Sequence, residues 1–218
     1  STGLLKNGNG KVTLLNNNTN TGVVTINAGT VAVGNGGTTG ALGGSGDIAT
    51  AAAGTLEFNR SDAQTLNRVI TGTGTLLKKG TGTLNASSGT TLFLPTNLTV
   101  DQGTLQISTG AFSGNRMNGV GQVVVNSTGT LLLSSAHSLG GDNNGVSEQF
   151  TINGGTLTVN GEQYLTKLTL NGGLINGSNE IRVPASNDYT VSGSTPSVIS
   201  ARVNQGFSSP NWKVADVT

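Results

Sequence analysis

The sequence has no cysteine, a single histidine and few charged or aromatic residues. The absence of cysteine excludes disulfide scaffolds and cysteine-ligated zinc. Basic residues (11) and acidic residues (10) nearly balance, leaving a net charge of +1, so we expect no surface for nucleic acid. Charged residues make up only 10% of the chain, and the Ala-, Glu-, Lys- and Leu-rich composition of long helices and coiled coils is missing.

The two ends of the sequence carry no targeting signal. No positively charged start is followed by an apolar run, so no signal peptide is predicted. No stretch of roughly 18 apolar residues could form a membrane helix. The repeating pattern is already under way at Ser1 and stops after Val217. We therefore expect a fragment of a longer protein, with any membrane anchor lying outside this chain.

Glycine, threonine, asparagine and serine are abundant instead, with 35 glycines among 218 residues. The apolar residues are mostly Val, Ile and Leu in short alternating runs, such as Val23–Ile26, Thr104–Ile107 and Thr156–Val159. Alternation bounded by Gly and Asn is typical of β-strands and argues against a flexible linker. Helical spacing is absent, and residues Arg60–Asn67 could form one helical turn at most.

A Gly-Thr-Leu or Gly-Thr-Val unit recurs along the chain. Gly173-Leu174-Ile175 is a degenerate further copy. Apart from the short step between the third and fourth units, which we interpret as two strands within one coil, the spacing stays between 20 and 26 residues. The complete units begin at Gly29, Gly54, Gly74, Gly82, Gly103, Gly129 and Gly155.

A larger duplication lies over these units. The stretch Gly3–Leu14 aligns with the stretch that begins at Thr75 at an offset of 72, which places Val12 opposite Leu84, and Val24–Val33 align with Leu98–Ile107 at an offset of 74. The difference of two residues falls in the variable loop between the halves. One unit cannot bury its apolar side alone, whereas stacked units can, because like side chains then lie above one another.

These observations predict an all-β fold, a single-domain parallel β-helix (a solenoid) over residues 1–218. Every coil runs in the same direction, so the stacked strands are parallel. Dividing the chain length by the period gives roughly nine coils. Glycine would supply the turns between strands, and stacked asparagines, as in Asn16-Asn17-Asn18, would form amide ladders.

The run Ile70–Leu84, ITGTGTLLKKGTGTL, resembles the autotransporter-associated β-strand repeat. That repeat reads roughly G-x-G-x-L-x-K-x-G-x-G-x-L, then a loop, then T-x-I-x-x-G-T-L. Residues 3–34 resemble one copy and residues 72–108 a second, while Ala53–Leu66 resembles the coil that links copies. Residues 109–218 keep the Gly-Thr-Leu units but lose the Lys-x-Gly-x-Gly box, so we interpret them as divergent coils.

The resemblance implies a right-handed parallel β-helix in a secreted passenger or very large surface protein of bacteria. It therefore implies a location at the cell surface or outside the cell, as in an outer-membrane passenger.

Catalytic constellations are sparse. The only histidine, His137, lies in a Ser-rich loop without the G-x-S-x-G elbow of a serine hydrolase. Glu162 and Glu180, one coil apart, could stack and are the best candidate pair for acid–base chemistry on a polysaccharide. The acids are otherwise spread evenly. The densest charged group, which we interpret as a surface ion-pair cluster, comprises Glu57, Arg60, Asp62 and Arg68.

Neither a metal nor a nucleotide is expected. Gly43–Ile48 approaches the calcium-binding nonapeptide of β-rolls but has no second copy, and Gly140–Gly145 offers one carboxylate where calcium wants 6–8 oxygens. We interpret both as tight turns. Gly72-x-Gly74 and Gly80-x-Gly82 lack the spacing of phosphate-binding loops. Lys78-Lys79 is interpreted as a charged spot on a solvated strand. We predict no cofactor, no metal and no catalytic residue.

Aromatic residues suggest where a sugar could bind. Most phenylalanines are expected in the core, whereas Tyr164, Tyr189 and Trp212 are expected to be partly exposed. Thr-x-Thr pairs could build a flat threonine array. The Thr-x-Thr pairs are Thr73/Thr75, Thr81/Thr83 and Thr156/Thr158.

The variable loops Gly34–Gly46 and Ser113–Gly119 are where we expect the residues that determine binding specificity.

The leading hypothesis is a non-catalytic structural and adhesive stalk that acts in display, adhesion or self-association. Its partners would be a second copy or a cell-surface or glycan ligand, not nucleic acid, and no binding residue is assigned. One alternative is a fragment of a polysaccharide-active β-helix enzyme. Another is a binder of an ordered surface or glycan through its Thr and Asn faces.

Overall fold

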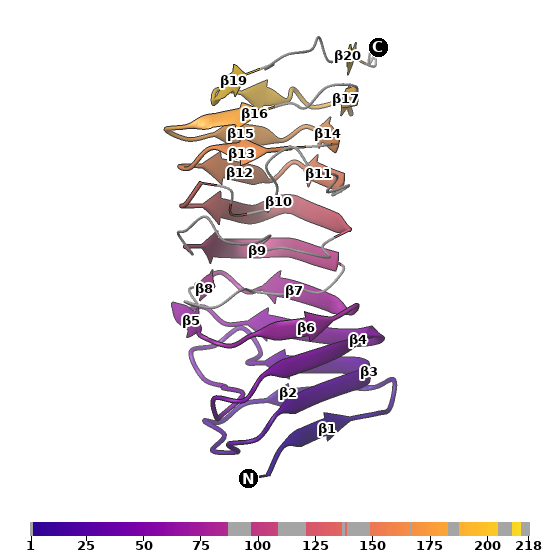
Figure 1. The fold of residues 1–218 in the computed structure, drawn as a ribbon, viewed down its shortest axis with the longest axis vertical. Coiled ribbons are helices and arrows are strands. Elements are labelled where there is room, and N and C mark those ends of the chain that lie inside the picture. Colours follow the sequence, from indigo (N-terminus) through magenta and orange to yellow (C-terminus); the bar gives the residue numbers. More distant parts are fainter. Residues whose placement is uncertain are drawn as a thin grey trace.

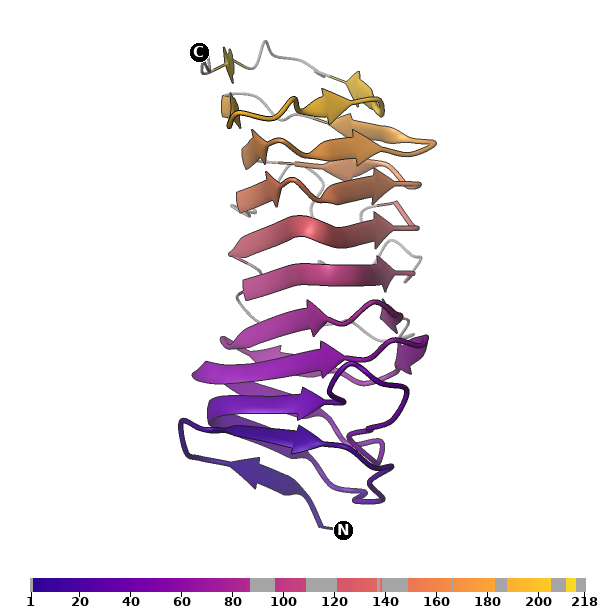
Figure 2. The same ribbon diagram turned by 180° about the vertical axis from the view of Figure 1, so that it is seen from behind.

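The structure, a computed structural model, describes residues 2–86, 97–108, 121–136, 138, 149–165, 167–182, 188–204 and 211–214. These residues form strands and no helix. Every pairing between the strands is parallel. The strands stack one above another from the N-terminal to the C-terminal end, as both views show (Figures 1 and 2). The predicted parallel β-solenoid is therefore confirmed.

The strands form three ladders and one short separate sheet. The first ladder contains β1 (Leu4–Lys6), the start of β3 (Val24–Val33), the start of β4 (Ile48–Asn59) and β6 (Ile70–Gly72). The short sheet contains β13 (Gln163–Tyr164), β16 (Glu180–Arg182) and β19 (Arg202–Asn204).

The second and third ladders run further along the solenoid. The second contains β2 (Lys11–Leu14), the ends of β3 and β4, β7 (Thr75–Lys79), the starts of β9 (Asn97–Ile107) and β10 (Gln122–Leu133), β11 (Gln149–Asn153), β14 (Lys167–Asn171), β17 (Asp188–Ser192) and β20 (Asn211–Val214). The third contains β5 (Gln64–Leu66), β8 (Thr83–Ala86), the ends of β9 and β10, β12 (Thr156–Val159), β15 (Leu174–Asn176) and β18 (Val198–Ile199).

The solenoid has about 7 turns, slightly fewer than the roughly nine that the chain length and period predict. The first turn, β1 and β2, pairs only with β3, and β20 pairs only with β17, so these end segments are stacked on one side only.

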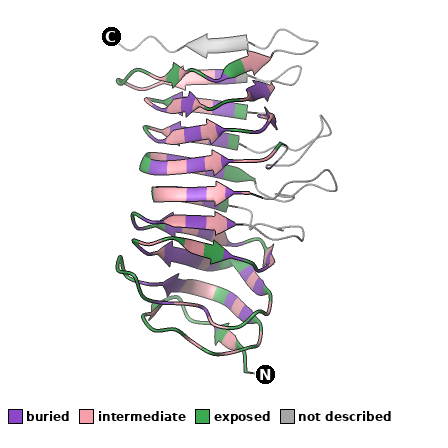
Figure 3. Cartoon of the chain, turned by 90° about the vertical axis from the view of Figure 1, so that its left-hand side faces the viewer, coloured by how far each residue is buried: buried purple, intermediate pink, exposed green. Residues whose placement is uncertain are grey.

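The core consists of columns of aliphatic side chains that point into the solenoid. In the third ladder, one residue of each Gly-Thr-Leu unit aligns in register with the same residue of the next turn. Burial alternates accordingly along β8, β12, β15 and the ends of β9 and β10 (Figure 3). The third residue of each unit thus lies in the core, and the second residue lies on the outer face. The buried column is Leu84, Leu105, Leu131, Leu157 and Ile175.

The two repeat copies occupy different sides of the solenoid. In the first copy, β1 and β2 belong to the first and second ladders. In the second copy, the corresponding strands β7 and β8 belong to the second and third ladders. The short step between Gly74 and Gly82 explains this shift, because β6, β7 and β8 follow one another around a single turn, as the sequence predicted.

Each copy has the same corner. The glycine of the Gly-Thr-Val or Gly-Thr-Leu unit in the second half of each copy has a left-handed backbone, with φ of 72° at Gly29 and 69° at Gly103. A Cβ at Gly103 would lie 2.5 Å from the carbonyl oxygen of Gly82, and a Cβ at Gly29 would overlap the carbonyl oxygens of Gly8 and Gly10. The glycine of each turn therefore packs directly against the Gly-x-Gly backbone of the turn before it. This close approach explains why the repeat has glycine at that position.

Candidate functional site

The predicted acid pair lies on the outside of the short sheet, joined by an arginine. Arg182 bonds Glu180 through Nε (2.9 Å to Oε1) and Glu162 through Nη2 (3.1 Å to Oε2). Arg202 Nε lies 3.3 Å from Glu180 Oε2, and the side-chain amide of Asn204 donates to Glu180 Oε1 over 3.1 Å. The sequence therefore found the two acids, but not the basic residues between them.

The electrostatics of this network do not favour acid catalysis. Hydrogen bonds from Asn204 and Arg182, with the charges of Arg202 and Arg182, lower the pKa of the Glu180 carboxyl. A general acid at neutral pH needs the opposite shift. Glu180 is thus held as an ion-paired carboxylate. The network joins Glu162, the pair Glu180 and Arg182, and the pair Arg202 and Asn204 from three successive turns. Such a network can hold neighbouring strands together or present a fixed pattern of charge to a ligand.

One aromatic side chain joins the network and another does not. Arg182 lies over the ring of Tyr164, 5.7 Å from its centroid, and donates to the Tyr164 hydroxyl over 3.3 Å. Tyr164 is half-buried, as predicted. The prediction for Tyr189 was wrong, because its side chain is fully buried and its hydroxyl donates to the carbonyl of Leu165 over 3.0 Å. Burial raises the pKa of Tyr189.

The remaining aromatics agree with the prediction where the structure describes them. Phe58 and Phe150 lie in the core. The side chain of Trp212 lies outside the described part of the chain, as do Phe93, Phe112 and Phe207. Tyr164 is therefore the one predicted sugar-binding aromatic whose half-exposed position is confirmed.

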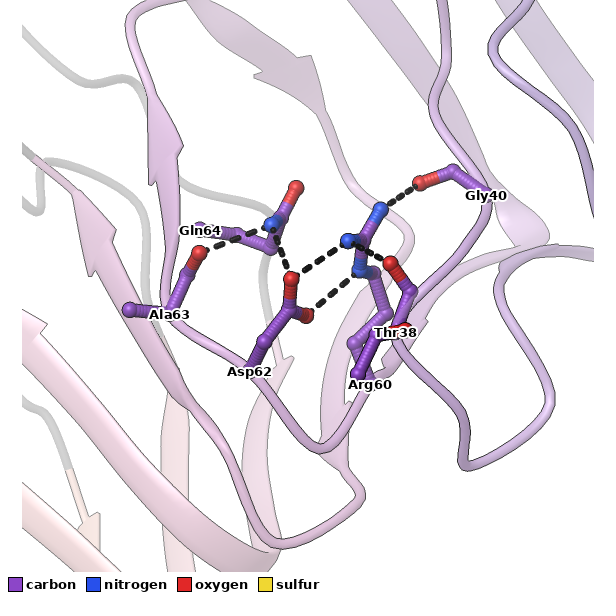
Figure 4. A network of polar contacts seen from close by, with 6 residues as sticks. All are labelled: Thr38, Gly40, Arg60, Asp62, Ala63 and Gln64. Carbon is purple, nitrogen blue, oxygen red and sulfur yellow. Dashed lines mark hydrogen bonds and ion pairs between the residues drawn. The ribbon is translucent and has the colours of Figure 1, made fainter.

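The predicted surface ion-pair cluster is only partly right. Arg60 and Asp62 do pair, with Nε to Oδ1 at 2.8 Å and Nη2 to Oδ2 at 2.6 Å (Figure 4). This contact lowers the pKa of Asp62. Glu57 instead binds Lys11, two turns below, at 2.7 Å. Arg68 donates to backbone carbonyls, and burial lowers its pKa. Three of the four side chains, Glu57, Arg60 and Arg68, are buried, and each bonds a different turn from its own.

The loop predicted to carry specificity, Gly34–Gly46, is held down by two of these arginines. Arg60 donates to the carbonyls of Thr38 and Gly40 (Figure 4). Arg68 donates to the carbonyls of Gly43, at 2.9 Å, and Gly46. Because both guanidinium groups are buried, the loop is an anchored part of the solenoid.

Sequence reasoning missed a buried lysine at each repeat corner. Lys78 was expected on a solvated strand, yet it is 2% exposed and lies in register between Phe58 and Val100. Its ammonium donates to the carbonyls of Lys79 (2.8 Å), Gly80 (2.7 Å) and Gln102 (3.0 Å). Burial lowers its pKa to about 8.

The first copy repeats this lysine contact. Lys6, at the equivalent position, is buried and donates to the carbonyls of Gly8 and Ala28. The lysine of the Lys-x-Gly-x-Gly box therefore binds backbone oxygens of its own corner and of the next turn. Its alternation with the inward Leu76 is the sequence signal that could have placed Lys78 inside.

Threonines line the outer face, but not as the Thr-x-Thr pairs. Thr73 and Thr81 lie in bends, so only Thr156 and Thr158 share a strand. Threonines align instead across successive turns of the third ladder, outside the leucine column. This outer column, which we call the threonine column, consists of Thr83, Thr104, Thr130 and Thr156.

Asparagine contacts between turns confirm part of the predicted amide ladders. Asn126 donates to Asp101 at 2.5 Å, and Asn153 donates to Asn126 at 3.4 Å. Asn27 donates to Asn7 at 2.7 Å. Within Asn16-Asn17-Asn18, Asn18 donates to backbone carbonyls, including that of Ala41 in the next turn. Such contacts join asparagine side chains of successive turns, as in an amide ladder.

Several residues that the sequence singled out lie in segments that the structure does not describe. His137, Ser113–Gly119 and Gly140–Gly145 lie outside the described residues. Within the described part of the chain, no three His, Cys, Asp or Glu side chains gather as a metal site would require. The same residues include no helix long and apolar enough to cross a membrane.

Comparison of the chain with protein-family models, curated proteins and solved structures finds no match.

Proposed function

We propose that this chain is a non-catalytic β-solenoid stalk of a bacterial surface protein of the autotransporter passenger type, acting in display, adhesion or self-association. Such a protein would be secreted or held at the cell surface. The mechanism is the spacing of a stiff rod and many weak contacts along its polar faces.

The observation that carries the proposal is the continuity of the inward columns. Leucine, isoleucine and valine align in register from turn to turn, so each turn is stabilised by burial against its neighbours. Such a design sets length and stiffness. The repeat copies at 3–34 and 72–108, which resemble the autotransporter-associated repeat, support the assignment to surface proteins.

The charged groups also support a non-catalytic role. Glu180 and Glu162 are the best-placed acids, and both are paired with Arg182. The Glu180 pKa is lowered, whereas a polysaccharide-cleaving acid needs a raised one. The alternative of an enzyme fragment is therefore less well supported.

A second candidate function is the binding of an ordered surface or a glycan. The threonine column favours it, because hydroxyl and methyl groups repeat at the spacing of neighbouring strands, about 4.8 Å. The neighbouring outer column contains Asn85, Gln106, Leu132 and Thr158, so its two amides and one hydroxyl are interrupted by a leucine. Tyr164, beneath Arg182, offers one aromatic contact nearby in sequence.

A bead assay distinguishes these functions. Beads carrying the full chain are scored for clumping and for binding to a glycan panel, and chain in solution is tested for release of sugar ends from soluble polysaccharides. The matched variants are Thr130→Glu, on the threonine column, and Thr190→Glu, on the outer face of the second ladder.

We expect the beads to clump without binding any glycan. We also expect one of the two glutamate variants to weaken clumping more than the other. Glycan binding without clumping would support the second candidate instead. Release of sugar ends would contradict a non-catalytic stalk. If the chain shows no clumping, no glycan binding and no release of sugar ends, adhesion and self-association would be contradicted, and the chain would act as a passive spacer.

A further inference from the structure

The outer side of the second ladder carries three aligned columns of side chains. The strands β7, β9, β10, β11, β14 and β17 contribute one row each, and they lie one above another on the right of Figure 1. Alternate residues point outward, because the residues between them, such as Leu98, Phe150 and Leu168, are buried. We call this surface the second-ladder face. Its central column, half-buried throughout, is Leu77, Thr99, Val124, Thr151, Thr169 and Thr190.

Amide side chains flank the central column on both sides. In one flanking column, the side chain of Asn126 donates to Asp101 over 2.5 Å, and that of Asn153 donates to Asn126 over 3.4 Å. These contacts hold the side chains in place before any partner binds, so binding costs less conformational entropy. The opposite flanking column is exposed, and its amides are Asn97, Gln122 and Gln149.

The second-ladder face is chemically suited to a surface like itself. Most of its central side chains are β-branched, and its amides and hydroxyls both donate and accept hydrogen bonds. Its rows repeat at the spacing of paired strands, about 4.8 Å. A second copy of this chain repeats at the same spacing. Two such faces therefore stay in register over every row, as paired sheets do in a zipper of polar side chains.

We propose that the second-ladder face binds the same face of a second copy, with the two solenoids side by side and pointing in the same direction. The inference rests on the proposed function, because it identifies the surface used for self-association. A symmetric pair of this kind has a two-fold axis that runs along the rods above the central column. Each row then meets the same row of the partner.

The two aliphatic residues of the central column decide the direction. When the solenoids point the same way, Leu77 meets Leu77 and Val124 meets Val124, which gives the interface an apolar centre. When they point in opposite directions, a single register matches Leu77 with Val124. That register places the Asp101 residues of the two copies opposite each other. Like charges opposite each other weaken binding, so the parallel arrangement is favoured.

The charged residues of the face are compatible with the parallel arrangement. The two-fold axis exchanges the two flanking columns. Lys167 therefore faces Asn171 of the second copy, and Asp101 faces Asn97. Each of these charged groups meets an amide instead of a like charge.

The size of the face predicts weak pairing between single copies. Its rows and columns cover roughly 500 Å² on each copy, whereas a typical stable complex buries about 800 Å² on each partner. In the row beneath Leu77, the central column continues to Glu57, whose carboxylate pairs with Lys11 of its own chain at 2.7 Å. Association therefore requires a high concentration of chain or many chains held together.

The first test compares one substitution on two faces of the full chain. Thr151→Glu lies in the central column, and its matched control, Thr130→Glu, replaces a half-buried threonine of the threonine column. Sedimentation equilibrium measures association, and thermal unfolding checks that both variants fold equally well. Because Thr151→Glu places two carboxylates opposite each other in the pair, it should raise the dissociation constant at least about tenfold. Thr130→Glu should leave it unchanged.

The second test measures the direction of pairing and uses the absence of cysteine from the chain. Thr99→Cys and Thr190→Cys each place one thiol near an end of the central column. A bis-maleimide too short to span several rows should link each variant to itself. In a mixture of the two variants, it should not link position 99 to position 190. Thr130→Cys is the control for random linkage.

Three results would overturn the inference. One is equal weakening of association by Thr151→Glu and Thr130→Glu, which would place the contact elsewhere. Another is linkage of position 99 to position 190, which would show solenoids that point in opposite directions. The third is the absence of both association and linkage at high concentration. The proposed function fails separately, by release of sugar ends from polysaccharides, so the two failures are distinguishable.

Discussion

The two repeat copies, residues 3–34 and 72–108, share the same repeat pattern and differ in what lies beneath them. Leu76 and Leu84 of the second copy are fully buried, whereas their counterparts Leu4 and Val12 are partly exposed. The corner lysine and the left-handed glycine keep the same contacts in both copies. A repeat therefore fixes its own corner, but it obtains a complete core only from neighbours on both sides.

This difference should appear most strongly in core truncations. Val31→Ala removes a fully buried side chain and should lower the free energy of unfolding by about 2 kcal/mol, and Leu84→Ala by about 2–5 kcal/mol. Val12→Ala, in the same column as Val31, should cost about 1 kcal/mol or less because Val12 is already in contact with water. Urea unfolding measures all three. Equal costs for Val12→Ala and Val31→Ala would contradict one-sided stacking.

Substitution of the left-handed glycine should instead reduce the stability of the protein by a similar amount in the two copies. Gly29→Ala and Gly103→Ala each introduce a side chain at positive φ and against carbonyl oxygens of the turn below. Each should lower the free energy of unfolding by about 2–4 kcal/mol. Denaturant unfolding of the pair checks this, with Gly37→Ala as a control in open space. A tolerated Gly29→Ala would show that the first corner is not built like the second.

The corner lysine of the second copy predicts a pH dependence. Burial lowers the pKa of Lys78 to about 8, from 10.5 in the unfolded chain. Between these values the unfolded state binds more protons, so the free energy of unfolding should rise with pH, by at most about 1.4 kcal/mol per unit. Unfolding from pH 7.5 to 9.5 tests this. Above that range, ionisation of Tyr189 in the unfolded chain opposes the trend, because burial raises its pKa in the fold.

Two variants separate the contribution of Lys78 from other groups. Lys78→Met should remove the rise in stability with pH, while Lys79→Met, at the exposed neighbour, should keep it. The same pH profile in Lys78→Met and in the unmodified protein would assign the effect to other residues.

The smallest expected effect concerns a contact that only the first copy has. Lys11 reaches Glu57 two turns away, whereas the second copy has Thr83 at that position. Lys11→Thr should cost about 1 kcal/mol at low salt, since Lys11 is half-exposed and Glu57 is buried. Adding Glu57→Gln should restore most of the loss. A cost unaffected by Glu57→Gln would mean that packing of the lysine stem, not charge, is responsible.

The sequence was sufficient for the fold because each Gly-Thr-Leu unit specifies three positions at once. Gly82, Thr83 and Leu84 provide the corner, the outer face and the core, and their period sets the stacking. The shift of the second copy to other ladders also follows from the short step between units. Local pattern and global fold agree along the chain, as expected of a repeat.

Charged and amphipathic residues were harder to place. Lys78 and Tyr189 were assigned to the surface by residue type, although each alternates with inward aliphatic neighbours. The contacts of Arg60 and Arg68 depend on carbonyls some 20 residues earlier in the chain. Such contacts exist only once the turns are stacked, so no local pattern indicates them. The same is true of Arg182 between Glu162 and Glu180.

Residue-resolved hydrogen exchange in the native state tests the account most directly, because it measures the stability of each turn within one molecule. Stacking on both sides predicts that amides of β8, the end of β9 and the end of β10 exchange only through global unfolding. Amides of β1 and β2 should exchange through a local opening of much lower free energy. Equal protection of β1 and β8 would contradict the claim that neighbours on both sides complete each repeat.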